Sequence, residues 1–86
     1  DVGSWEALWT IAEKDQDGNV ARGDVHLLDS RNSYVLSSGP HVGTIGIEDI
    51  VVVATGDAVL VTRRDRSQDV KRIVDALKAG ERSNLL

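Results

Sequence analysis

The sequence contains no cysteine, methionine or phenylalanine, and it has only one proline. Without cysteine, the chain can form neither a disulfide framework nor a zinc site with thiolate ligands. This absence fits a reducing compartment, and we expect the protein to be cytoplasmic. Long apolar runs are missing too: the longest, residues 50–54, is far shorter than the roughly 20 residues that a membrane-spanning helix needs.

Strong positive charge is also absent, because the formal net charge is −4. A mildly acidic chain argues against general binding to nucleic acid or to an anionic membrane. With 86 residues, of which 41% are hydrophobic and 28% charged, the composition predicts one small globular domain. The chain begins with Asp1 rather than Met, so we expect it to belong to a longer polypeptide.

Motifs for common cofactors are absent: the sequence contains no GxGxxG, no P-loop and no HExxH. His26 and His41 are the only histidines, and no third ligand follows from the spacing, which favours surface or structural roles over a metal site. Residues 15–19 resemble a calcium loop only loosely, because the register is wrong and the bidentate glutamate is missing. A capped turn is the favoured interpretation of this segment.

Two helices are predicted at the ends of the chain. Residues 5–14 carry apolar side chains at i, i+3, i+4 and i+7, with Ser4 as the expected N-cap. A second helix follows from the same spacing in residues 70–77. Asp65 and Gln68 resemble a capping box before this helix, and Gly80 suits its C-terminal end.

The middle of the chain is predicted to be rich in strands, because short runs of Val, Ile and Leu alternate with turn residues. The expected strands are residues 24–28, 32–36, 42–47, 50–53 and 58–62. Three of them share a polar residue followed by an apolar cluster, which indicates the stacked rungs of a short β-helix or β-roll. The irregular spacing leaves a small sandwich open.

Three further groups of residues allow either a binding role or a simpler structural one. The basic run at residues 63–66 could hold a phosphate near the start of the second helix, but local ion pairs in solvent are favoured. Trp5 and Trp9 could stack on a base or sugar, but packing against the strands or the rest of the parent protein is favoured. Asp1, just before a helix, could bind Mg²⁺ that bridges nucleotide phosphates, and Gly3 allows a close approach of the backbone, but on spacing alone a loop that leads into a capped helix is favoured.

Several spaced motifs, taken together, resemble one enzyme family over nearly the whole chain, from Asp1 to about Leu77. They are Asp1-Val2-Gly3-Ser4-Trp5, Gly18-Asn19-Val20, Gly23-Asp24-Val25 and Leu28-Asp29-Ser30-Arg31-Asn32, followed by residues 51–55, 57–61 and 64–71. The chain resembles the C-terminal segment of the bacterial mannose-1-phosphate guanylyltransferases. It is most similar to the type that is often fused to a mannose-6-phosphate isomerase domain.

The resemblance implies a nucleotidyltransferase that makes GDP-mannose and pyrophosphate from GTP and mannose 1-phosphate, with Mg²⁺ as cofactor. It places the metal-binding aspartate at Asp1 and a loop that contacts substrate at Gly3. The Gly-rich nucleotide loop, the basic residue for the triphosphate and the partner carboxylate of this family have no counterpart here. The catalytic set is therefore incomplete, and we expect the 86-residue chain alone to be inactive.

The resemblance also implies an α+β, β-rich fold: a short left-handed β-helix-like stack of strands, flanked by an N-terminal and a C-terminal helix that packs on it. Residues 1–19 would form the edge of a catalytic domain that otherwise lies outside this chain, residues 20–80 the β-helix-like domain, and residues 81–86 a tail or linker. Such domains commonly support contacts in a homo-oligomer. Two alternatives stay open: a fragment of another sugar-nucleotide transferase, or a non-catalytic β-rich oligomerisation module.

Overall fold

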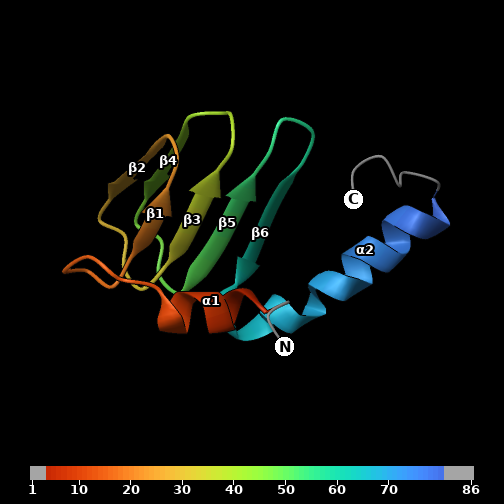
Figure 1. The fold of residues 1–86 in the computed structure, drawn as a ribbon, viewed down its shortest axis with the longest axis horizontal. Coiled ribbons are helices and arrows are strands. Elements are labelled where there is room, and N and C mark those ends of the chain that lie inside the picture. The colour runs from red at the N-terminus through yellow and green to blue at the C-terminus, as the bar shows by residue number, and fades with distance from the viewer. Residues whose placement is uncertain (1–3, 81–86) are drawn as a thin grey trace.

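A computed structural model describes residues 4–80, which form a β-rich fold with two α-helices and two sheets (Figure 1). The elements in chain order are α1 (Trp5–Ile11), β1 (Val20–Arg22), β2 (Val25–Leu28), β3 (Tyr34–Ser37), β4 (Val42–Ile45), β5 (Ile50–Ala54), β6 (Val59–Arg63), a 3₁₀ helix η1 (Arg64–Asp69) and α2 (Val70–Ala79). All five predicted strands exist, within two residues of the expected bounds. Strand β1 was missed, because only the first of its three residues is buried.

The chain coils back and forth between the two sheets. β1, β3 and β5 are parallel neighbours in one sheet, while β2 and β4 form a parallel pair in the other. A parallel bridge between Arg31 and Glu48 adds a third line of contact between successive turns. Parallel pairing of each strand with its counterpart one turn later is typical of stacked rungs, which excludes the small sandwich.

The register explains why the repeat was hard to see in the sequence. Tyr34 pairs with Val51, Val25 with Val42 and Arg31 with Glu48, so each pair is 17 positions apart. The first pairing of the coil, β1 with β3, instead joins residues 14 positions apart, such as Val20 and Tyr34 in that register. The connection from β3 to β4 is longer than that from β1 to β2, which breaks the period at this one corner.

The corners of the rungs also stack. Gly18, Asn32 and Asp49 all have positive φ, at 79°, 53° and 61°, and they occupy equivalent corners of three successive turns. Asp29 and Gly46, with φ of 50° and 68°, repeat at a second corner, again 17 positions apart. Asn and Asp tolerate this left-handed conformation better than other non-glycine residues, which explains their place here.

The coil ends in a hairpin. β6 runs antiparallel to β5 and forms the edge of the four-stranded sheet. Its side chains alternate between exposed and half-buried, and Val59 and Val61 are both largely exposed.

The core of the fold is small and partly polar. Val20, Tyr34 and Val51 form its buried apolar centre, against which residues of α1 pack. Asn19 is buried within the coil, where its amide donates to Ser30 O at 2.8 Å and accepts from Ser33 N at 3.0 Å. Because these polar groups are paired, their burial carries little penalty.

The first helix is shorter than predicted. It ends at Ile11, not at residue 14, because Ala12 has extended backbone angles (φ −74°, ψ 153°). Lys14 lies beyond the helix, but its ammonium group donates to the carbonyls of Thr10 and Ala12. Ser4 stands at the N-cap position without capping; its hydroxyl instead lies 3.3 Å from that of Ser67.

The second helix begins differently from the prediction. The capping box of Asp65 and Gln68 is wrong, since this stretch forms η1 and no side chain caps α2. Gly80 has a φ of −90°, so the left-handed cap is absent too. Nor does α2 lie flat on the sheets: it contacts η1 and extends away from the strands (Figure 1). No helix within residues 4–80 has the length and apolar character to cross a membrane.

Candidate functional site

The two residues predicted to contact metal and substrate, Asp1 and Gly3, lie outside the described residues. The described part begins at Ser4, directly before α1. The structure does show how α1, which follows these residues in the chain, is held against the strands.

Helix α1 lies across one end of the strands (Figure 1). Trp5 packs on Tyr34 with ring centroids 5.6 Å apart, and Trp9 donates its indole N–H to Gly18 O at 2.9 Å. Leu8 packs on the same apolar core. Both tryptophans are thus engaged with the coil, which supports the packing interpretation over base or sugar stacking.

Arg64 joins three parts of the fold at this junction. Its guanidinium stacks over the Trp9 ring at 3.6 Å, donates from Nη1 to Glu6 Oε1 at 2.9 Å, and donates from Nη2 to Asp49 Oδ1 at 3.1 Å. Glu6 is in the first turn of α1, Asp49 is a corner of the coil and Arg64 begins η1. The Arg64 side chain is only 15% exposed, so these interactions are weakened less by solvent than surface pairs are.

The sequence did not predict that Glu6, Asp49 and Arg64 come together. Glu6 and Asp49 lie 58 and 15 positions from Arg64, so no local spacing connects the three residues. The only available signal was a tryptophan at the polar margin of an apolar helix face together with an arginine that follows a strand. That combination occurs too often to single out a site.

A second contact joins α1 to η1. The Ser67 side chain is 2% exposed, and its hydroxyl accepts from Glu6 N at 3.3 Å while also lying near the Ser4 hydroxyl. The first turn of α1 thus has one of its free N–H groups satisfied by a residue 61 positions away. This contact and the Arg64 pair both attach α1 at its N-terminal turn.

The other arginines of the basic run form local ion pairs. Arg63 pairs with Asp65 at 2.5 Å, and Arg66 pairs with Asp69 at 2.6 Å. The hydrogen bond from Arg66, reinforced by its charge, lowers the pKa of Asp69 below its ordinary value, and the same bond raises the pKa of Arg66. This supports the interpretation of solvated local ion pairs for Arg63 and Arg66. For Arg64 that interpretation is wrong, because its side chain is only 15% exposed and pairs with residues distant in the sequence.

The histidines and the acidic turn have structural explanations. His41 Nδ1 lies 2.8 Å from Asp24 Oδ1 on the surface, and the His26 ring is 6.4 Å away. Residues 4–80 contain no group of three or more His, Cys, Asp or Glu side chains placed to hold a metal ion. Asp15 Oδ1 accepts from Asp17 N and Asn19 N, both at 2.9 Å, so the predicted capped turn is confirmed.

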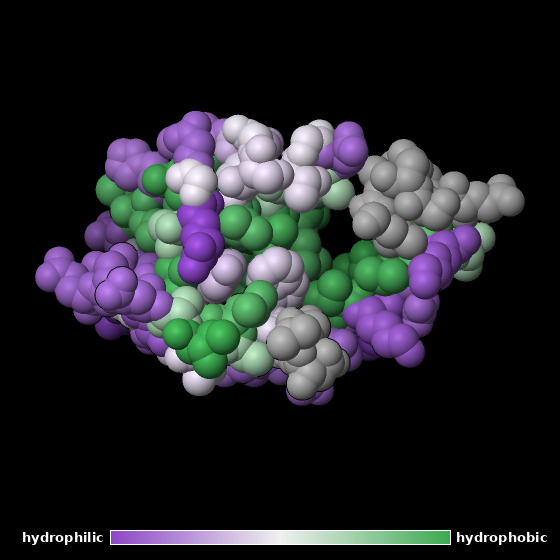
Figure 2. All heavy atoms as spheres, viewed as in Figure 1, coloured by the Kyte–Doolittle hydropathy of each residue, from purple (hydrophilic) through white to green (hydrophobic). Residues whose placement is uncertain are grey.

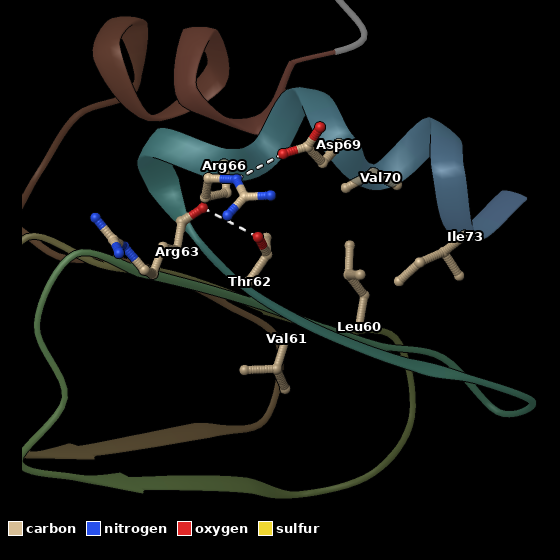
Figure 3. A pocket seen from close by; sticks show the side chains of 8 residues that line it. All are labelled: Leu60, Val61, Thr62, Arg63, Arg66, Asp69, Val70 and Ile73. Carbon is tan, nitrogen blue, oxygen red and sulfur yellow. Dashed lines mark hydrogen bonds and ion pairs between the residues drawn. The ribbon is translucent and has the colours of Figure 1, made fainter.

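A groove runs between β6 and the start of α2 (Figure 3). Leu60, Val70 and Ile73 point into it, and the Arg66–Asp69 pair lies at one end. Figure 2 shows apolar surface over the sheet and over α2, with a hollow between them. With one satisfied ion pair among aliphatic side chains, the groove suits packing rather than reaction chemistry.

Comparison with known proteins identifies relatives of this fold. Residues 23–77 match the model of the MannoseP isomerase/GMP-like beta-helix domain family. A protein of Klebsiella pneumoniae named mannose-1-phosphate guanylyltransferase is 52% identical over 96% of this chain, and the alginate biosynthesis protein AlgA of Pseudomonas aeruginosa is 51% identical over the same share. The chain spans only 18% and 17% of the lengths of these two relatives.

A solved structure agrees with these relatives. The crystal structure described as a mannose-1-phosphate geranyltransferase from Thermus thermophilus superposes with a TM-score of 0.79 at 32% identity. It covers 90% of this chain, which corresponds to 24% of that protein. The resemblance seen in the motifs is confirmed, and the chain belongs to the MannoseP isomerase/GMP-like beta-helix domain family.

Proposed function

We propose that this chain is the β-helix segment of a mannose-1-phosphate guanylyltransferase, whose complete protein makes GDP-mannose and pyrophosphate from GTP and mannose 1-phosphate. The observation that carries the proposal is the 52% identity to a protein of that name over 96% of the chain. Because the match spans 18% of that relative, the nucleotide and sugar sites belong mostly to the remaining length. The 86 residues alone are expected to be inactive.

The role proposed for the segment is to hold α1 in place. The Arg64 cluster, the Ser67 contacts and the Trp5–Tyr34 packing all fix α1 to the coil. Because α1 is the first element of the chain, we propose that holding it supports the part of the complete protein that precedes the coil. A rigid support of this kind lowers the entropic cost of orienting reactants.

Mg²⁺ is the proposed cofactor of the complete enzyme, where it would offset charge on the nucleotide phosphates. No carboxylate cluster within residues 4–80 fits the ion. The family resemblance places one ligand at Asp1 and a substrate-lining position at Gly3, and we propose that the other ligands come from the rest of the complete protein. A single carboxylate does not complete the octahedral geometry that Mg²⁺ demands.

A left-handed coil is proposed for the stack of rungs. In Figure 1, β1, β3 and β5 run upward in front, β2 and β4 run downward behind them, and the chain advances from left to right. This path supports left-handed winding, which is the reverse of the usual crossover between parallel strands. A crystal structure of the complete protein would test the hand directly.

Three further features are proposed for the complete protein. Subunit contacts through the exposed apolar residues of β6 and α2 would make it a homo-oligomer, and light scattering measures its mass. Cytoplasmic location is checked by cell fractionation. A mannose-6-phosphate isomerase activity on the same polypeptide is checked by conversion of mannose 6-phosphate to fructose 6-phosphate.

The function is tested with a panel of substrates. The complete protein and the 86-residue chain are each incubated with Mg²⁺, one nucleoside triphosphate and one sugar 1-phosphate, and the products are identified by mass. We expect GDP-mannose from the complete protein with GTP and mannose 1-phosphate, and no product from the chain. A strong preference for another base or sugar would favour a different sugar-nucleotide transferase, and no product with any pair would favour the non-catalytic module.

A further inference from the structure

We propose that Arg64 is a positioning residue for guanylyl transfer, because it sets the placement of α1, the helix through which the coil joins the preceding part of the complete protein. The inference rests on the proposed function. Arg64 begins η1, which follows the coil in the chain and lies 58 positions after Glu6. It acts on α1 through its contacts with Glu6 and Trp9. Nothing in its own sequence neighbourhood indicates this role.

Helix α1 depends on outside contacts for its position. It has seven residues, none of them fully buried, and its N-cap residue Ser4 makes no capping hydrogen bond. An isolated helix of this length is unstable in water, so its docking contacts determine its placement. Its charged contact with the rest of the fold, among the described residues, is the pair of Glu6 with Arg64.

The geometry at Arg64 requires an arginine. One Nη donates to Glu6, the other donates to Asp49, and the planar face lies on Trp9. A lysine ammonium group is a compact charge on a flexible stem, which cannot stack and direct two separate donors in the same way. Arginine therefore fixes both the distance and the angle between helix and coil.

The Nε atom of Arg64 shows that this orientation has a cost. Among residues 4–80, the Nε atom of Arg64 is a buried side-chain donor that has no hydrogen-bond partner. Leaving a buried donor unpaired is unfavourable, and such groups in folded proteins call for an explanation. The guanidinium is oriented by the two carboxylates and the indole ring, at the expense of its third donor group.

The test uses the complete protein and four variants: three single substitutions and the double variant of Arg64→Lys with Glu6→Gln. Arg64→Lys keeps the charge and removes the stacked, two-pronged geometry, while Glu6→Gln removes the charge on α1. Arg31→Gln is the matched control, because Arg31 forms a single exposed ion pair with Glu48 on the same coil. For each variant we would measure kcat, KM for mannose 1-phosphate, the unfolding temperature and hydrogen exchange of α1 and β5 amides.

We expect Arg64→Lys and Glu6→Gln to lower kcat by about 10-fold or more, since a small misplacement of reacting groups can cost up to about 100-fold. KM should change by less than about 3-fold, because the loss concerns the transition state more than ground-state binding. The α1 amides should exchange faster while the β5 amides stay unchanged. The double variant should fall no further than the worse single variant, since both changes break one contact. Arg31→Gln should match the wild type throughout.

Two results would overturn this inference and leave the proposed function intact. In the first, the wild type is active and Arg64→Lys has the same kcat. In the second, the loss of kcat in the variants is fully explained by the fraction of unfolded protein. A wild-type protein without guanylyltransferase activity would instead refute the proposed function, and this inference with it. The exchange data separate these cases, because they report on α1 regardless of catalysis.

Discussion

Replacement of Gly23 by alanine should destabilise the coil strongly. Gly23 has a φ of +92°, and a Cβ built there would lie 2.0 Å from the backbone oxygen of Ser37. The left-handed conformation costs a non-glycine residue about 1–2 kcal/mol. The obstacle is a strand carbonyl rather than a movable side chain, so relief of the clash requires a backbone shift that costs about 1–3 kcal/mol more. The total, about 2–5 kcal/mol, is a large share of the roughly 4–13 kcal/mol expected for 86 residues.

Two other glycines separate the contributions. Gly46 has a φ of +68° with no atom within 4 Å of an added Cβ, so Gly46→Ala should cost only the conformational term of about 1–2 kcal/mol. Gly43 has neither restriction and lies in β4, so Gly43→Ala should stabilise by up to about 1 kcal/mol. The three substitutions are chemically identical and differ only in backbone and surroundings.

Urea unfolding of the 86-residue chain measures these differences. The two tryptophans, Trp5 and Trp9, lie at the junction of α1 with the coil and report on it by fluorescence. The expected order of stability is Gly43→Ala, wild type, Gly46→Ala and Gly23→Ala. The reasoning is refuted if Gly23→Ala is as stable as Gly46→Ala, or if Gly43→Ala loses as much as either.

Three further changes test the core, the docking of α1 and an ion pair. Val51→Ala should cost about 1.5–3 kcal/mol, because the side chain is fully buried and two methyl groups leave a cavity, whereas Val61→Ala at an exposed site should cost less than about 0.5 kcal/mol in the same urea assay. Trp9→Phe keeps a ring and loses the indole hydrogen bond, so it should lower the free energy of unfolding by about 1 kcal/mol. An unchanged stability would show that this hydrogen bond does not stabilise the fold. The pKa of Asp69 is lowered in the fold, so the stability contributed by its pair is present above the unfolded pKa and lost as pH falls through the folded one. Arg66→Gln should therefore raise the Asp69 pKa toward its ordinary value in an NMR titration, and an unchanged pKa would contradict the assigned cause.

Local patterns predicted the elements well, because each depends on nearby residues. Apolar spacing located both helices, and short aliphatic runs located β2 to β6 within two residues. The limits of the helices depended on the tertiary fold. Ala12 adopts an extended backbone between α1 and the coil, and the Ser4 hydroxyl lies 3.3 Å from that of Ser67 instead of capping the helix.

The stacking of the rungs was visible only in outline. The 17-residue register is hidden by the shorter first turn, and β1 offers a single buried residue, Val20. Nor could local patterns reveal the Arg64 cluster, whose members come together only after the coil has formed. The metal contact predicted at Asp1 and the substrate contact predicted at Gly3 rest on the family resemblance and stay predictions.

The function proposed above makes the complete protein a mannose-1-phosphate guanylyltransferase, with Asp1 as a proposed ligand of Mg²⁺. The most direct measurement is pyrophosphate release by that protein with GTP, mannose 1-phosphate and Mg²⁺, compared among wild type, Asp1→Asn and the control Asp57→Asn at an exposed turn. The account predicts turnover in the wild type and the control, and a loss of about 100-fold or more in a folded Asp1→Asn variant, as for removal of one strong electrostatic contact in a transition state. Equal turnover in Asp1→Asn would contradict the metal role of Asp1, and no pyrophosphate release from the wild type would contradict the guanylyltransferase itself.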